Sequence, residues 1–360
     1  MADAPGKPSS SKPADTPLRP AAPWVCTRGF SYQRQEPQRL LTMAVFTQVS
    51  EDDARTLLQS LDLGQLTALR GIQGGIENTN YFLDTTQGHW VLTLFERLTA
   101  EQLPFYLELM RHLARKGIPV PDPQADRTTG AILHTVCGKP AAVVQKLRGT
   151  SQLQPTPRHC AAVGRMLAQM HLAGRDFALH QPNLRGLPWW NATVPTVLPF
   201  IPAEAAQLLQ AELAHQNEVA ASAAYAALPR GPIHADLFRD NVMFEGEALT
   251  GFFDFYFAGV DTWLFDLAVC LNDWAIEHST GAHTPALAAA MLDAYQSVRP
   301  LEAAERALLP ALLRAGALRF WISRLWDFYL PREASLLTPH DPRHFEQVLR
   351  QRIAQPFCLE

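Results

Sequence analysis

The sequence predicts an α+β fold with two lobes, a small antiparallel sheet in the N-terminal lobe and a larger, mainly helical C-terminal lobe. Between Leu66 and Leu147, short apolar runs bounded by turn residues follow one another, with one helical segment among them. After Leu147, apolar residues recur at helical spacing. The chain has 360 residues, 47% of them hydrophobic, which is enough to bury two cores. We expect the lobes at residues 43–147 and 148–360.

The first 42 residues differ in composition from the rest of the chain. Pro, Ser, Ala and Lys dominate much of residues 1–42, and no periodic apolar face appears there. We expect this segment to be disordered, either as an extension or because the start site is misassigned, and the folded part to begin at Met43. Ser50 then fits a helix cap, because Leu57 and Leu61 recur on one face of the following residues.

Five strands and one helix are expected in the N-terminal lobe. The strands fall at residues 66–73, 80–84, 90–95, 131–135 and 141–146. The helix spans about 100–116 and is closed by Gly117 before Pro119. In the second lobe, helices are expected at 157–173, ended by Gly174, and from near Thr262 onward.

The chemistry is concentrated in GPIHADLFRDNVMF, residues 231–244, and in ALTGFFDFYFAG, residues 248–259. Each Asp or Asn alone is common in a turn. The ordered set of Asp236, Asn241 five residues later, and Asp254 after an apolar strand is typical of kinases. In them, one Asp accepts the hydroxyl proton, and an Asn and a later Asp hold Mg²⁺ on the ATP phosphates. The sequence therefore predicts an ATP-dependent kinase with a protein-kinase-like fold, in which His234 orients the loop.

A nucleotide site is expected on the first lobe. Its glycine pair lies in GGIENTN, residues 74–80, where backbone amides can approach phosphate without a Cβ in the way. Such a pair alone is usually only a turn, and its place upstream of the catalytic segment gives it meaning. The backbone at 143–146 is expected to pair with adenine. The residues predicted to bind the nucleotide are Gly74, Gly75, Asn78, Asn80, Val91, Thr93, Val144 and Lys146.

The pattern H-A-D-L-x-x-D-N-V-x-F with a downstream F-D-F resembles the aminoglycoside phosphotransferase and choline kinase superfamily. From Met43 to the C-terminus the chain looks closest to the bacterial homoserine kinases, on segments such as GGIENTNYF, EQLPFYLELMRHL, GVDTWLFDLAVCLNDW and RFWISRLWDFYLPR. The resemblance implies phosphorylation of the side-chain hydroxyl of L-homoserine, a step of threonine biosynthesis, with ATP and Mg²⁺. It also implies that Asp266 supports the catalytic loop.

The chain departs from most of that superfamily at Thr93, where a lysine usually pairs with the nucleotide phosphates. Threonine cannot supply that charge. Either the chain binds nucleotide without turnover, or another cation or backbone donor takes over. The homoserine kinases it resembles also have threonine there, which favours the second explanation, and Arg239 is the nearest candidate. Glu108 stands where the acidic partner of the lysine would be.

The acceptor pocket should present a carboxylate or an aromatic face to an ammonium group and an arginine to a carboxylate. Asp273, Trp274 and Arg324 are the candidates in this sequence, although aromatic residues at helical spacing are more often part of the core. Other acceptors remain open, such as choline, an aminoglycoside or a hydroxylated amino acid. A regulatory protein that binds nucleotide without catalysis also remains open.

Composition excludes several other classes. A net charge of −4 argues against nucleic acid as a partner, and no apolar stretch approaches the roughly 20 residues that span a bilayer. The five cysteines are scattered and lack CxxC spacing, as is typical of reduced thiols. We therefore expect a cytoplasmic enzyme that acts on a small molecule, with neither nucleic-acid nor membrane partners.

Overall fold

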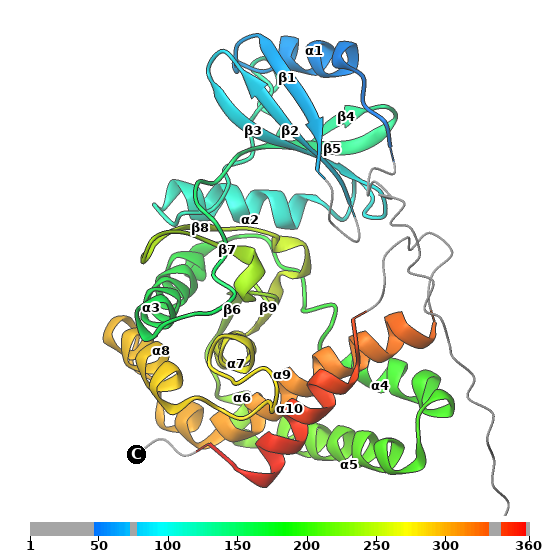
Figure 1. The fold of residues 1–360 in the computed structure, drawn as a ribbon, viewed down its shortest axis with the longest axis vertical. Helices are drawn as coiled ribbons and strands as arrows, with labels where there is room; N and C mark the ends of the chain where they lie inside the picture. The colour runs from blue at the N-terminus through cyan, green and yellow to red at the C-terminus, as the bar shows by residue number, and fades with distance from the viewer. Residues whose placement is uncertain (1–46, 73–77, 331–339, 358–360) are drawn as a thin grey trace, which may run out of the picture. The chain divides into compact units, whose positions relative to one another are not determined.

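The computed structural model describes residues 47–72, 78–330 and 340–357 (Figure 1). The expected disorder of residues 1–42 and the phosphate-binding roles of Gly74 and Gly75 lie outside this range. Among the described cysteines, Cys137, Cys160 and Cys270 are free thiols, as expected. None of the described helices is both long enough and apolar enough to cross a lipid bilayer.

Five antiparallel strands form the sheet of the N-terminal lobe, in the order β1-β2-β3-β5-β4. They are β1 (Leu66–Gly71), β2 (Asn78–Thr85), β3 (Gly88–Phe95), β4 (His134–Val136) and β5 (Lys139–Gln145). The predicted sheet is confirmed. Its largest error is in β4, which begins at His134 and not at residue 131.

Two helices accompany this sheet, α1 (Glu51–Ser60) and α2 (Pro104–Arg115). Ser50 caps α1 as expected, since its side chain accepts a hydrogen bond from the amide of Asp53. Figure 1 shows α2 below the sheet, on the side of the C-terminal lobe. Its rings reach that lobe, because Tyr106 meets Tyr256 edge to face at 6.1 Å.

The C-terminal lobe is mainly helical, as predicted. Its helices are α3 (Pro157–Ala173), α4 (Leu187–Val197), α5 (Ala203–Ala220), α6 (Ala223–Ala226), α7 (Trp263–Trp274), α8 (Pro285–Val298), α9 (Ala303–Tyr329) and α10 (Arg343–Ala354). Thr262 caps the start of helix α7, near where the helix was expected to open, and every residue of α7 is buried. Figure 1 shows α7 end-on in the middle of this lobe. A helix buried on all sides offers a rigid frame for the loops that contact it.

Four short strands carry the catalytic segment: β6 (Arg230–Ile233), β7 (Val242–Glu245), β8 (Ala248–Phe252) and β9 (Gly259–Thr262). The predicted hairpin is β7–β8. The pairing of β6 with β9 was not predicted, and it ties the start of the catalytic segment to the N-terminus of α7.

The segment that follows β5 connects the two lobes and makes a close backbone contact with the C-terminal lobe. Thr150 and Phe244 exchange backbone hydrogen bonds of 2.9 and 3.0 Å, so the connection is bonded to β7. Gly149 adopts a φ of +92°, and a Cβ there would lie 2.2 Å from the Phe244 carbonyl oxygen. Only glycine fits both conditions.

Replacing Gly149 by Ala should lower the free energy of unfolding by about 1–3 kcal/mol, because the new Cβ meets backbone at an already strained φ. Gly130→Ala is the matched control: Gly130 has a φ of +74° but nothing within 4 Å of a Cβ, so only the strain of φ is added. Urea unfolding of both variants measures the difference. Equal losses would show that the contact with Phe244 is unimportant.

Candidate active site

The catalytic loop is held by one buried carboxylate, that of Asp266 on α7. Its two oxygens accept the backbone amides of His234 and Ala235, both at 2.8 Å. The imidazole of His171 on α3 lies 3.1 Å from the same carboxylate and bonds the Tyr295 hydroxyl with its other nitrogen at 2.8 Å. Burial raises the pKa of Asp266, but the hydrogen bond from His171, the backbone hydrogen bond from His234 and the electrostatic effect of both imidazoles together hold that pKa below its usual value. Asp266 is therefore ionised and supports the loop, the role that the resemblance implies.

This carboxylate offsets backbone strain at the loop. Ala235 has a φ of +64°, a left-handed conformation that costs an alanine roughly 1–2 kcal/mol. The amide of Ala235 is one of the two that Asp266 accepts. The strained turn places Asp236 directly after it.

His234 joins the catalytic loop to the strand that leads to Asp254. Its Nε2 donates to the Phe253 carbonyl at 2.9 Å, which leaves Nδ1 to accept the Asp236 amide at 3.3 Å. The ring is fully buried. It thus orients the loop through two backbone groups, as its predicted role requires.

Asn241 and Asp254 are brought to neighbouring positions by the β7–β8 hairpin. The Asn241 amide nitrogen donates to the Asp236 carbonyl at 2.8 Å, and the Phe253 amide donates to the Asn241 carbonyl at 3.0 Å. Because the side-chain nitrogen is engaged, the amide oxygen is the group that can face a metal. Asp254 adopts a left-handed φ of 68°, which Asp tolerates better than most residues.

Asp236 is surrounded by both signs of charge. Burial first, and then the negative charge of Asp254, raise its pKa to about 8, while the Arg319 guanidinium on α9 acts in the opposite direction. An oxygen from Asn241 and a carboxylate from Asp254 suit Mg²⁺, which uses few protein ligands together with water and phosphate oxygens. Among the described residues, no group of three or more His, Cys, Asp or Glu side chains could hold a metal.

The predicted nucleotide-binding side chains share one face of the N-terminal sheet. The register pairs Asn78 with Phe95, Asn80 with Thr93, and Val91 with both Phe82 and Val144. Directly paired side chains lie on the same face, and so do residues two apart. This nucleotide face therefore carries Asn78, Asn80, Phe82, Val91, Thr93 and Val144. The opposite face packs its leucines on α1.

The expected backbone contacts to adenine are corrected by the pairing of β5. The Lys146 amide donates to the His89 carbonyl at 3.0 Å, so it cannot donate to a base. Backbone groups alternate between the two edges of a strand, and those of Val144 therefore also face β3. Gln145 directs its backbone to the other edge. The Lys146 ammonium lies 4.3 Å from the centre of the Phe82 ring.

A neutral network occupies the place of the usual lysine. Thr93 donates to the Asn80 side-chain oxygen at 2.7 Å, and Thr93 also hydrogen-bonds Tyr256, two residues after Asp254. Thr93 is buried. Glu108 is half-buried and lies 3.8 Å from Arg111 on the same helix.

Arg239 does not take over the role of the lysine. Its backbone amide, Nε and one terminal nitrogen contact the Asp273 carboxylate at 2.8, 3.1 and 3.2 Å, and its other terminal nitrogen donates to the Leu153 carbonyl at 2.8 Å. Both side chains of this ion pair are largely buried. The predicted phosphate role of Arg239 and the predicted acceptor role of Asp273 are thus corrected, because each satisfies the other.

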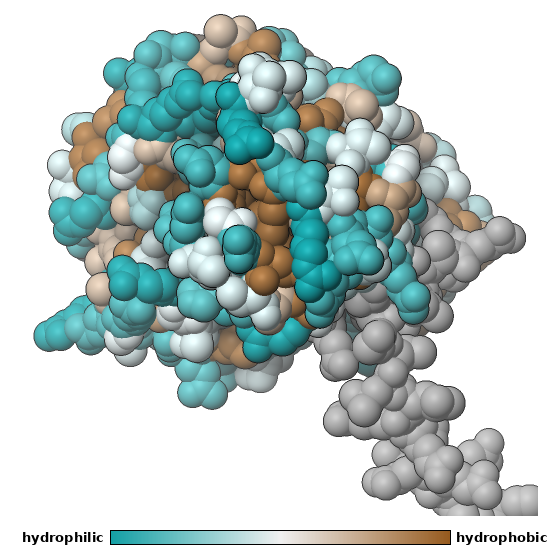
Figure 2. Space-filling model, turned by 90° about the horizontal axis from the view of Figure 1, so that it is seen from above, coloured by the Kyte–Doolittle hydropathy of each residue, from teal (hydrophilic) through white to brown (hydrophobic). Residues whose placement is uncertain are grey.

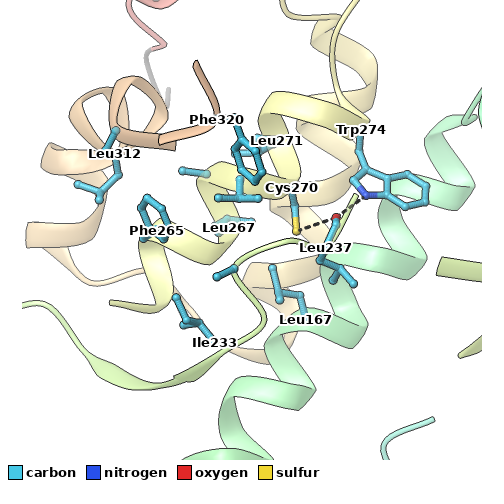
Figure 3. Packing of buried hydrophobic residues seen from close by; sticks show 14 of the residues in the cluster. Leu167, Ile233, Leu237, Phe265, Leu267, Cys270, Leu271, Trp274, Leu312 and Phe320 are labelled. Atoms are coloured by element: carbon cyan, nitrogen blue, oxygen red, sulfur yellow. Dashed lines mark hydrogen bonds between the residues drawn. The ribbon is translucent and has the colours of Figure 1, made fainter. Parts of the chain in front are cut away.

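Trp274 is a second correction, since its side chain is fully buried and cannot line an acceptor pocket. Figure 3 shows Trp274 and Cys270 of α7 converging on the Leu237 carbonyl of the catalytic loop. The indole donates at 3.0 Å and the thiol at 3.7 Å. Trp274 therefore holds the residue that follows Asp236.

Arg324, a predicted acceptor-binding residue, lies close enough to Asp236 for the two charges to interact. It is half-buried on α9, and its guanidinium lies 4.4 Å from the centre of the Phe345 ring. Burial lowers its pKa, while the charges of Asp273 and Asp236 raise it. Arg319 was not among the predicted acceptor-binding residues. It is buried on the same helix, and its charge acts on Asp236 while its guanidinium packs on the Phe257 ring.

The cavities on the described part of the chain include the following two. The larger, about 380 Å³, is lined by α1 and β4 residues such as Leu57 and Val136, and contains none of the predicted site residues. Figure 2, which shows the molecule from above, has a hydrophobic strip between hydrophilic residues. The smaller, about 230 Å³, is lined by Asn78, Arg97, Leu98, Tyr106, Leu184, Arg185, Tyr256 and Phe257. Only the smaller cavity adjoins the catalytic segment.

Known proteins share this sequence over most of its length. The family model described as "Phosphotransferase enzyme family" matches residues 68–311. A homoserine kinase of Polaromonas naphthalenivorans is 65% identical over 317 residues, which cover 88% of this chain and 100% of that protein. A homoserine kinase of Paraburkholderia phytofirmans is 59% identical over 319 residues, covering 86% and 96%.

Solved structures share the fold at much lower identity. The amicoumacin kinase hAmiN, in complex with AMP-PNP, Ca²⁺ and Ami, has a TM-score of 0.63 at 16% identity, over 84% of this chain and 92% of that chain. The choline kinase LicA of Streptococcus pneumoniae has a TM-score of 0.58 at 11% identity, over 84% and 99%. At these identities the similarity concerns the fold, and it confirms the predicted kinase-like architecture.

Replacing Asp266 by Asn should lower the free energy of unfolding by about 3 kcal/mol or more, because an amide can accept only one of the two backbone N–H groups with its oxygen. Asp293→Asn, the same change at an exposed residue of α8, is the control. Urea unfolding compares the variants. A loss no larger than that of the control would show that the loop does not depend on Asp266.

Lowering the pH should destabilise the folded protein, because several buried histidines resist protonation in the folded state. Burial lowers the pKa of His171, His234 and His283, the last to about 3, whereas an unfolded histidine titrates near 6.5. Below about pH 6.5 the unfolded chain thus binds protons that the folded chain does not, and stability falls with falling pH. Each imidazole contributes up to about 1.4 kcal/mol per pH unit.

Urea unfolding of the native chain and of His283→Asn between pH 7.5 and 5.5 tests this. Asn keeps a donor near the Ala275 carbonyl, which the His283 Nδ1 approaches at 3.4 Å. The variant should show a shallower loss of stability with acid. Parallel curves for the two proteins would contradict the role given to His283.

Proposed function

This chain belongs to the phosphotransferase enzyme family, together with the homoserine kinases, and we propose that it transfers the γ-phosphoryl group of ATP to the side-chain hydroxyl of L-homoserine. The assignment of homoserine as the substrate rests on the similarity to homoserine kinases over nearly the whole described chain. The catalytic loop held by Asp266 carries the chemistry.

Asp236 is the residue that we assign to the acceptor hydroxyl. It follows the strained turn at Ala235, its backbone amide bonds His234, and its carbonyl accepts from Asn241. The backbone of Asp236 is therefore held on both sides of its side chain. It would orient the hydroxyl and accept its proton as the phosphoryl group moves.

Asn241 and Asp254 are the residues that would hold the divalent cation, which we propose to be Mg²⁺. A bound cation neutralises charge on the nucleotide phosphates and aligns them with the acceptor. The nucleotide face would cover the base with the side chains of Phe82, Val91 and Val144. Gln145, whose backbone faces away from β3, is the residue we assign to hydrogen bonds with adenine.

The acceptor would lie between Asp236 and helix α9. Homoserine carries a carboxylate three bonds from its hydroxyl-bearing carbon, and Arg319 and Arg324 are the cations of α9 whose charge acts on Asp236. A guanidinium recognises a carboxylate with two parallel hydrogen bonds. Choline lacks that group, so these arginines favour an amino acid over choline.

The full chain should release ADP from ATP in the presence of magnesium and homoserine, and more slowly with serine, threonine, choline or kanamycin. Selective turnover of homoserine supports the proposal. Turnover of another acceptor would keep the kinase and replace its substrate. Silence with all acceptors, despite measurable ATP binding, would contradict the proposed activity.

Asp236→Asn should reduce kcat by at least about a thousandfold while leaving the dissociation constant of ATP nearly unchanged, because the amide cannot accept the proton. Asp240→Asn, a similar change at an exposed residue of the same loop, is the control for folding. Substantial turnover by the Asp236 variant would remove Asp236 from its assigned role.

A further inference from the structure

Three cations that could have replaced the usual lysine are each engaged by another residue. Lys139 pairs with Glu96, which also accepts the hydroxyls of Thr79 and Thr47 at 2.6 and 2.7 Å. Glu96 follows Leu94 by two positions and so continues the face of the sheet opposite to Thr93. Lys146 covers the Phe82 ring, and Arg239 is paired with Asp273.

The smaller cavity is lined both by the nucleotide face and by the residues that follow Asp254. One wall is Asn78, on the same sheet face as Asn80 and Thr93. Another wall is Tyr256 and Phe257, directly after the predicted metal ligand Asp254. A group bound in this cavity would therefore contact the nucleotide face on one side and the residues next to the predicted metal ligand on the other. The cavity holds two arginines, Arg97 and Arg185.

We infer that Arg97 and Arg185 contact the polyphosphate of the nucleotide from this cavity and supply the positive charge that Thr93 cannot. The inference rests on the proposed use of ATP. Arg97 lies just after β3 and Arg185 just before α4, so the phosphate would draw one cation from each lobe.

The setting of Arg185 suits recognition of an oxyanion. Its guanidinium lies 4.5 Å from the centre of the Trp189 ring and 5.9 Å from that of Phe257. Stacking engages the flat face of a guanidinium, whereas its N–H donors lie in its edge and match phosphate in pairs. The amide of Arg185 also donates to the Asn183 side chain at 3.0 Å, which fixes the loop that carries it.

Nucleotide binding by calorimetry tests the inference, with adenosine, ADP and AMP-PNP as probes in the presence of magnesium. Arg97→Gln and Arg185→Gln should each weaken AMP-PNP binding about ten- to hundredfold, the range expected for lost charge-assisted hydrogen bonds. Adenosine binding should stay within about twofold, since the base contacts the nucleotide face. Arg185→Lys should recover part of the loss by keeping the charge.

Arg158→Gln is the matched control, because Arg158 is exposed and pairs with Glu247 away from the site. It should bind all three probes as the native chain does. Thermal unfolding and adenosine affinity identify a variant that has simply lost its fold, and Arg97 and Arg185 provide independent variants in different lobes.

Unchanged AMP-PNP affinity in both arginine variants would overturn the inference. So would a raised KM for homoserine with unchanged nucleotide affinity, because the cavity would then take the acceptor carboxylate. If the native chain binds AMP-PNP but does not phosphorylate homoserine, the proposed substrate is wrong. The nucleotide-binding measurements on the arginine variants would still test this inference. If it binds no nucleotide, both are overturned.

Discussion

The active site depends on the bond between the Asp266 carboxylate and two successive backbone amides. Without those acceptors, Ala235 would keep its strained left-handed φ and would also leave its buried backbone amide without a hydrogen bond. Both changes would destabilise the loop. The carboxylate can stay charged in the interior because His171 and the amides compensate its desolvation. Helix α7, buried along its whole length, then transmits the rigidity of the core to Asp236.

The order of the catalytic residues could be predicted from sequence because kinase chemistry dictates it locally. Asp236 and Asn241 are five residues apart and act in one loop, and the apolar strand before Asp254 is visible as such. The starts of two helices could also be predicted from sequence, because Ser50 and Thr262 each cap a helix by accepting a backbone amide three residues later. Local rules therefore gave the strands of the first sheet, the β7–β8 hairpin, the helices α1, α2, α3 and α7, and the loop.

What sequence could not predict were contacts between distant segments. Arg239 finds Asp273 across 34 positions, and a pattern cannot tell whether an arginine faces phosphate or a carboxylate. Trp274 recurs at a spacing shared by core and pocket residues, so only the packed structure places its indole on Leu237. The adenine-facing backbone depends on strand register, and a shift of one residue exchanges Val144 for Gln145.

The neutral contact of Thr93 with Asn80 and Tyr256 has a regulatory consequence. Protein kinases are switched by forming or breaking a lysine–glutamate ion pair when a helix of the nucleotide lobe moves. Here the corresponding helix, α2, holds Glu108 in contact with its own Arg111 and is anchored by aromatic rings to the C-terminal lobe. Moving α2 would disrupt packing without changing any charge at Thr93. A lysine–glutamate pair between this position and α2 therefore cannot serve as the switch of this active site.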